Sequence, residues 1–286
     1  MIGGPHDVVG VVTRTDSAQG RKKVLTPTPV ATEAEASGVP VIRANRLEPV
    51  ANELAALQPD LGVIVAYGGL VREPLLSAPR LGWINLHFSL LPRWRGAAPV
   101  QRAIIAGDQE TGAAVFQLVP ELDAGDVFAS ESHPIGRNQT AGHLLESLAA
   151  SGAVLLERVV DDLAAGTAHS TPQRGAPTFA PKLTLEDGRI DWSKDVTMVD
   201  ALIRGVTPEP GAFTTIDGER FKVHAAAIAH DAPRLDAGTF AERGGRVYAG
   251  TASAPLELIE VQPAGKRAMP AADWWRGRGG SPVVAR

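Results

Sequence analysis

Two polar side chains of complementary chemistry, Asn85 and His87, stand at the end of the apolar run "GWINLH". Side chains alternate along a strand, so both would point to the same face of a sheet. Asp123 follows the later apolar run "AAVFQLV", and a strand-helix-strand unit between the two runs could bring its carboxylate beside His87. An amide, an imidazole and a carboxylate could stabilise an oxyanion, move a proton and orient the imidazole, as acyl transfer to an amine requires. Spacing alone also fits caps of helices and turns.

The elements that would position these groups alternate regularly between residues 7 and 166. Short Val- and Ile-rich runs, typical of strands covered on both faces, alternate with helix-like segments. Leucine and valine recur at helical spacing over residues 140–165, which predicts one long helix. We therefore expect an α/β domain over residues 1–166 with a mostly parallel sheet, whose ligands lie at the carboxyl ends of the strands.

A second region follows a segment rich in Pro, Gly, Thr and Ser, which is typical of a linker, over residues 167–185. Residues 186–286 contain a predicted helix near 196–204 and then short strands separated by turns. This pattern favours a small β-barrel domain.

Composition excludes several classes of site. The chain has no cysteine, which excludes disulfides, thiolate metal sites and cysteine nucleophiles and is typical of a cytoplasmic protein. No apolar run reaches the roughly 18 residues of a membrane span. The net charge of −4 gives no global attraction to nucleic acid, so such a partner would need local basic patches. Of the 7 histidines only His87 has a site-like setting, and no metal site is expected.

The residues of three sequence motifs indicate a family. "NLHFSLLPRWRGAAPVQRAI" and "ELDAGD" contain Asn-x-His, Ser-Leu-Leu-Pro-x-x-Arg-Gly and Leu-Asp-x-Gly in order. Together they closely resemble the signature of the folate-dependent formyltransferases. The segments "RTDSAQGRKKVLTPTPV", "RIDWSKD" and "AADWWRGR" are similar to the tRNA-acting branch of that family, and the resemblance covers residues 7–277.

This resemblance implies a Rossmann-like formyltransferase domain followed by a small OB-like β-barrel domain that binds tRNA. It implies transfer of the formyl group of 10-formyltetrahydrofolate, as donor substrate and without a metal, to the amino group of methionyl initiator tRNA. Asn85 and His87 would stabilise the oxyanion, and Asp123 would orient His87 and help to move the proton. The folate-binding residues implied are Ser89, Leu90, Leu91, Pro92, Arg95, Gly96, Tyr67 and Gly68.

Basic residues in two places match the tRNA contacts that the resemblance implies. Arg21, Lys22 and Lys23 lie in an expected long loop that resembles the family's acceptor-stem loop, and Lys266 and Arg267 lie in a basic tail. Taken alone, such clusters also fit solvated loops. Trp274 and Trp275 in that tail fit either base stacking or a core. We expect a cytoplasmic monomer that binds charged initiator tRNA and folate and no membrane.

Two other hypotheses remain: a small-molecule formyltransferase or formyltetrahydrofolate hydrolase, and a folate- or RNA-binding module without catalysis.

The resemblance also implies a strand and a helix before the segment "HDVVGVVTRTD". We therefore expect the natural protein to begin about one strand-helix unit, roughly 20 residues, before Met1.

Overall fold

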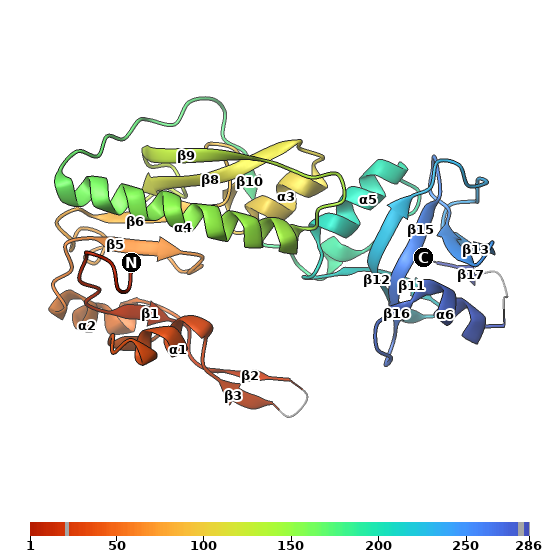
Figure 1. Ribbon diagram of the computed structural model, residues 1–286, viewed down its shortest axis with the longest axis horizontal. Helices are drawn as coiled ribbons and strands as arrows, with labels where there is room; N and C mark the ends of the chain where they lie inside the picture. The colour runs from red at the N-terminus through yellow and green to blue at the C-terminus, as the bar shows by residue number, and fades with distance from the viewer. Residues whose placement is uncertain (21–22, 280–282, 286) are drawn as a thin grey trace. The chain divides into compact units, whose positions relative to one another are not determined.

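The computed structural model describes residues 1–20, 23–279 and 283–285 and divides into two compact units (Figure 1). Strands β8 and β9 and helix α4 contribute residues to both units. The first unit comprises Met1–His87, Ala114–Ser130 and Gly152–Gly175, and the second comprises Phe88–Ala113, Glu131–Ser151 and Ala176–Arg286.

The first unit opens with two parallel strands and a connecting helix. β1 (Val11–Thr13) pairs with β4 (Val41–Arg43), and α1 (Pro29–Ala36) lies between them in the chain. Thr28 caps α1, because its hydroxyl accepts a hydrogen bond from the Ala31 amide at 3.1 Å. The region expected as one long loop contains an antiparallel hairpin, β2 (Ser17–Gln19) and β3 (Val24–Thr26), which extends away from α1 in Figure 1.

The site strand belongs to a separate sheet of four strands in the order β5-β6-β8-β9. β5 (Gly62–Val65) runs parallel to β6 (Trp83–His87), whereas β8 (Glu110–Gln117) runs antiparallel to β6; β9 (Val127–Pro134) is the edge strand. Within the described ranges no pairing joins β1 to β5. The parallel pairs β1–β4 and β5–β6 agree with the expected parallel strands, whereas the antiparallel pair β6–β8 does not, because an apolar run predicts a strand but not its direction or its partner.

Short helices and turns connect β4 to β6 and close a small core. η1 (Glu48–Val50) and α2 (Ala51–Ala56) precede β5, and residues 73–81 form turns and bends. The Trp83 indole N–H donates to the Leu75 carbonyl at 2.8 Å, which fixes these turns against β6. The core consists of apolar side chains from both segments: Ile42, Leu47, Leu54, Val71 and Leu75.

The helix expected over residues 140–165 is confirmed as α4 (Ala141–Ala165). In the second unit its first turns pack with α3 (Pro99–Ile105) through Val100, Ile104, Leu144 and Leu148. Two short parallel strands, β7 (Arg95–Gly96) and β10 (Phe179–Ala180), join the turn before α3 to the segment expected as a linker.

The C-terminal part is mostly antiparallel β structure. Its sheet has 7 strands in the order β11-β12-β15-β14-β13-β17, with β16 paired to β15. Among the described residues no pairing closes this sheet into a barrel. Trp274 and Trp275 are buried in its core beside Phe221 and Phe240, so they belong to the core rather than to an exposed stacking surface. The elements are η2 (Glu186–Gly188), α5 (Val196–Gly205), β11 (Ala212–Ile216), β12 (Glu219–Ile228), β13 (Thr239–Arg243), β14 (Arg246–Ala249), β15 (Leu256–Pro263), β16 (Met269–Pro270), α6 (Ala271–Gly277) and β17 (Val283–Val284).

Candidate active site

Strand β6 presents Asn85 and His87 on one face and buries Ile84 and Leu86 on the other. His87 is only 6% exposed, and its ring meets the edge of Phe116 on β8 with centroids 6.3 Å apart. Burial of a polar side chain costs free energy unless a partner or a ligand compensates it. The imidazole is therefore held in a fixed, largely water-free setting at the carboxyl end of β6.

The structure brings Asp123 next to His87, as the spacing predicted. The Asp123 carboxylate oxygen Oδ2 lies 3.8 Å from His87 Nδ1, and the two side chains are 11% and 6% exposed. This distance exceeds that of a hydrogen bond, although it allows an ion pair when the imidazole is protonated. A carboxylate at this place can orient the imidazole and stabilise its cationic form.

The chain connection that places Asp123 near His87 differs from the expected strand-helix-strand crossover. Because β8 is antiparallel to β6, its carboxyl end lies beside Ile84 and not beside His87. The loop of residues 118–126 must therefore turn back toward His87. The end of this loop is held at Asp126, whose carbonyl accepts a hydrogen bond from the backbone N–H of Gln117 at 2.9 Å.

Asn85 contains a buried acceptor that the protein leaves unused. Its side-chain oxygen Oδ1 is buried and has no hydrogen-bond partner within the part of the chain that the structure describes. A buried polar atom without a partner costs about 1–3 kcal/mol, so such atoms are rare away from functional sites. An N–H group of a bound substrate would satisfy this oxygen.

The turn of residues 89–96, expected to bind folate, is rigid. Ser89 is fully buried and its hydroxyl donates to the Arg93 carbonyl at 2.6 Å. Gly96 has a φ of +122°, and a Cβ there would lie 2.8 Å from the Ala180 carbonyl oxygen. Only glycine tolerates this close approach. Leu90, Leu91, Pro92 and Arg95 complete the turn, all of them half-buried.

Outside the predicted set, Asp108 anchors this turn. Its carboxylate accepts hydrogen bonds from the Arg93 guanidinium and from the Trp94 indole N–H, each at 2.8 Å. The bond to Asp108 raises the pKa of Arg93. Its position just after the apolar helix "PVQRAII" gave no signal of this role.

Tyr67 and Gly68 follow strand β5 in the first unit. Tyr67 is half-buried against the core around Ile42, and burial, with a smaller effect of the Glu48 charge, raises the pKa of its phenol. Gly68 is exposed, with a φ of +75° that favours glycine.

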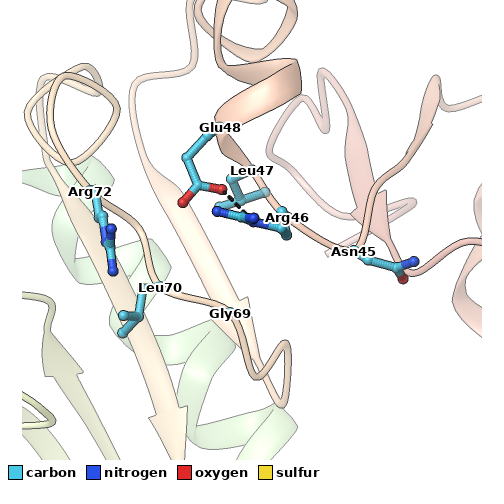
Figure 2. A pocket seen from close by; sticks show the side chains of 7 residues that line it. All are labelled: Asn45, Arg46, Leu47, Glu48, Gly69, Leu70 and Arg72. Atoms are coloured by element: carbon cyan, nitrogen blue, oxygen red, sulfur yellow. Dashed lines mark ion pairs between the residues drawn. The ribbon is translucent and has the colours of Figure 1, made fainter.

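A hollow of about 190 Å³ lies beside these residues, between the segments that follow β4 and β5 (Figure 2). Arg46 and Glu48 form an ion pair of 3.4 Å there, and Arg72 comes from the opposite segment. The hydrogen bond from its own backbone amide and the contact with Arg46 lower the pKa of Glu48. Neither His87 nor Asp123 lines this hollow, and no local pattern of residues indicates it.

The structure describes some of the candidate tRNA-binding residues. Lys23 is exposed immediately before β3, and Arg21 and Lys22 lie outside the described residues. Lys266 and Arg267 are exposed on the turn between β15 and β16. The Gln262 side chain donates to the Lys266 carbonyl at 2.9 Å and contacts His224 at 3.0 Å, so this basic turn has a defined conformation.

Among residues 1–20, 23–279 and 283–285, no group of three or more metal-ligating side chains could hold a metal ion. None of the helices within those ranges is long and apolar enough to cross a membrane.

Comparison with known proteins gives matches over nearly the whole chain. The formyl transferase family model matches residues 3–160, and the model of the formyl transferase C-terminal domain matches residues 182–279. The methionyl-tRNA formyltransferase of Clavibacter sepedonicus is 60% identical over 282 residues, which are 98% of this chain and 92% of that protein. That of Renibacterium salmoninarum is 52% identical over 98% of this chain and 91% of its own length.

Solved structures share the fold at low identity. HypX from Aquifex aeolicus in complex with tetrahydrofolic acid gives a TM-score of 0.60 at 18% identity, over 85% of this chain and 43% of HypX. WlaRD, a sugar 3N-formyl transferase solved with dTDP and 5-N-formyl-THF, gives 0.65 at 14% identity, over 90% of this chain and 88% of that one.

Proposed function

The chain belongs to the formyl transferase family, and within it to the methionyl-tRNA formyltransferases, and from that premise we propose how its residues carry out the reaction. The formyl group of 10-formyltetrahydrofolate is transferred to the amino group of methionine esterified to initiator tRNA. A new C–N bond forms to the amine, the bond between the formyl carbon and folate nitrogen N10 breaks, and one proton moves from the amine to N10.

The observation that carries this proposal is the polar group at the end of β6. His87 and Asp123 lie 3.8 Å apart in a nearly water-free setting, and the Asn85 Oδ1 acceptor is buried without a partner in the described structure. Attack of the amine on the formyl carbon places negative charge on the formyl oxygen, and hydrogen-bond donors preorganised around that oxygen lower the barrier.

Each of the three side chains has a distinct role in this proposal. Asn85 Nδ2 and the His87 imidazole donate to the oxyanion, while Asn85 Oδ1 accepts a hydrogen bond from the attacking amine. Asp123 orients His87 and helps to move the proton between the amine and the donor. An amide that is both donor and acceptor suits a site where an N–H and an oxyanion meet.

Folate binding is assigned to the rigid turn of residues 89–96, with Tyr67 and Gly68. The buried Ser89 and the glycine-dependent path at Gly96 support this, since a backbone that is already ordered loses little conformational entropy when the donor binds.

Binding of tRNA is assigned to the two basic segments. Arg21, Lys22 and Lys23 in the first segment, and Lys266 and Arg267 in the second, would neutralise phosphates of the tRNA backbone. The C-terminal domain, residues 186–286, would be the small OB-like β-barrel that the sequence suggested. The reaction would take place in the cytoplasm, where initiator tRNA is used, and the monomeric state stays a prediction.

A small-molecule acceptor is the less well supported alternative. The likeness to a sugar formyl transferase has 14% identity and shows the fold alone, whereas the relatives at 50–60% identity are methionyl-tRNA formyltransferases.

The experiment compares acceptors at equal donor concentration. The purified chain is incubated with 10-formyltetrahydrofolate and either methionyl initiator tRNA, free methionine, an amino-sugar nucleotide or water, and N-formyl product and free tetrahydrofolate are measured. We expect rapid formylation of the charged tRNA only. Faster formylation of the amino sugar, or release of formate without an acceptor, would contradict the proposal.

A further inference from the structure

We infer that Gln173 is a positioning residue for Asp123, acting from the segment that follows α4. The inference rests on the proposed role of Asp123 and adds a residue to that same site. In sequence Gln173 lies 50 residues from Asp123, within the segment whose composition predicted only a linker.

The side-chain amide of Gln173 holds two backbone carbonyls of the Asp123 loop. Its nitrogen Nε2 lies 2.8 Å from the Asp123 oxygen and 2.8 Å from the Gly125 oxygen. A primary amide has two N–H donors, so each carbonyl can receive one of them. One side chain thus fixes the loop on both sides of Ala124.

The segment that carries Gln173 is itself fastened to the end of the same loop. Thr171 and Val127 exchange two backbone hydrogen bonds, each of 2.9 Å. Gln173 is only two residues from this bridge and is half-buried, so its amide has a fixed origin from which to reach the loop.

The Asp123 loop needs such support because its backbone path is unusual. Asp123 has a φ of +47°, in the left-handed region that few residues other than glycine adopt. The Gly125 Cα lies so close to the chain that an added Cβ would be 1.7 Å from the Gln117 carbonyl oxygen. Conformations of this kind persist only where surrounding contacts hold them.

Loss of the Gln173 donors should therefore move the Asp123 carboxylate relative to His87. Misplacement of a catalytic group by about 1 Å can reduce the rate by about 100-fold. For Gln173→Leu, which keeps the approximate size and removes the donors, we expect kcat to fall by about 10- to 100-fold. The KM values for donor and tRNA should change by less than about threefold, because Gln173 would touch neither substrate.

The test is a double-mutant cycle on the full-length chain. Formyl transfer to methionyl-tRNA is measured for wild type, Gln173→Leu, Asp123→Asn and the double variant, with Arg174→Leu as an exposed control from the same segment. If Gln173 acts through the carboxylate, Gln173→Leu should reduce kcat by less than about twofold in the Asp123→Asn background. Arg174→Leu should have wild-type kcat.

Two results would overturn the inference: a Gln173→Leu enzyme with kcat within twofold of wild type, or an equal loss in both backgrounds. Should Gln173→Leu fail to fold, Gln173→Asn keeps the donors on a shorter side chain. Gln173→Asn should reduce kcat in the wild-type background and leave it unchanged in the Asp123→Asn background. An equal loss of kcat in both backgrounds would refute the inference. Full activity of Asp123→Asn alone would instead reject the proposed role of Asp123.

Discussion

Replacing Gly125 with alanine should disable the loop that carries Asp123. The added Cβ would lie 1.7 Å from the Gln117 carbonyl oxygen, 2.8 Å from the Gln117 carbonyl carbon and 3.4 Å from Val119 Cγ1. A carbon and a carbonyl oxygen ordinarily approach no closer than about 3.3 Å. The two backbones must therefore separate by roughly 1.5 Å.

Neither partner in this clash can rotate away, because the Cβ is fixed by the Gly125 backbone and the Gln117 carbonyl is itself backbone. The backbone N–H of Gln117 donates to the Asp126 carbonyl at 2.9 Å, so a shift of Gly125 also strains this neighbouring hydrogen bond. A displacement of this size exceeds the roughly 0.5 Å tolerance of a catalytic arrangement. We expect kcat to fall by at least about 100-fold.

Stability should fall as well, because the clash resembles overpacking. A cost of about 1–3 kcal/mol corresponds to a decrease in Tm of roughly 2–12 °C for a chain of this size.

The assay measures kcat for methionyl-tRNA and the thermal midpoint of the same purified variants. Gly136→Ala is the matched control, since a Cβ there meets its nearest atoms at 3.4 Å, in ordinary contact. That variant should have wild-type activity and stability. A Gly125→Ala enzyme that keeps kcat within threefold of wild type would refute the reasoning, whether or not its Tm has changed.

Two further predictions concern other parts of the chain. Hydrogen bonds from Thr184 lower the pKa of Asp187 below its usual 3.8, so the carboxylate stabilises the fold above that pH. Asp187→Asn should therefore lower Tm at pH 7, and the difference in Tm from wild type should decrease as the pH falls below about 4. A difference in Tm that stays constant with pH would contradict this prediction. Neutralising Lys266 and Arg267 together should weaken tRNA binding and reduce the slope of log affinity against log salt by roughly 0.7–0.9 per lost phosphate contact, without changing the KM for folate; an unchanged slope would show that this turn is only solvated.

The sequence predicted the central contact and missed how it is built. The spacing of Asn85 and His87 places both on one face of a strand, and that holds in any sheet arrangement. Strand direction is different, because hydrophobic periodicity is the same in both directions. The helix before β8 suggested a parallel crossover, and the antiparallel pairing of Asn85 with Phe116 shows otherwise.

Contacts between distant segments were the least predictable. Gln173 holds the Asp123 loop from a segment that reads as a linker by composition. Asp108 anchors the turn around Trp94 from just beyond an apolar helix. Neither residue has a local pattern that differs from that of a solvated polar side chain, so only the fold reveals its role.

The most direct test of the account is the single-turnover rate of formyl transfer by His87→Ala, measured with saturating 10-formyltetrahydrofolate and methionyl initiator tRNA. Circular dichroism and folate affinity of the same sample establish that the variant is folded and binds its donor. We predict a rate reduced by about 100-fold or more, because the imidazole is lost from the oxyanion and from the proton transfer. A folded His87→Ala enzyme with near wild-type rate would contradict the assignment of the site.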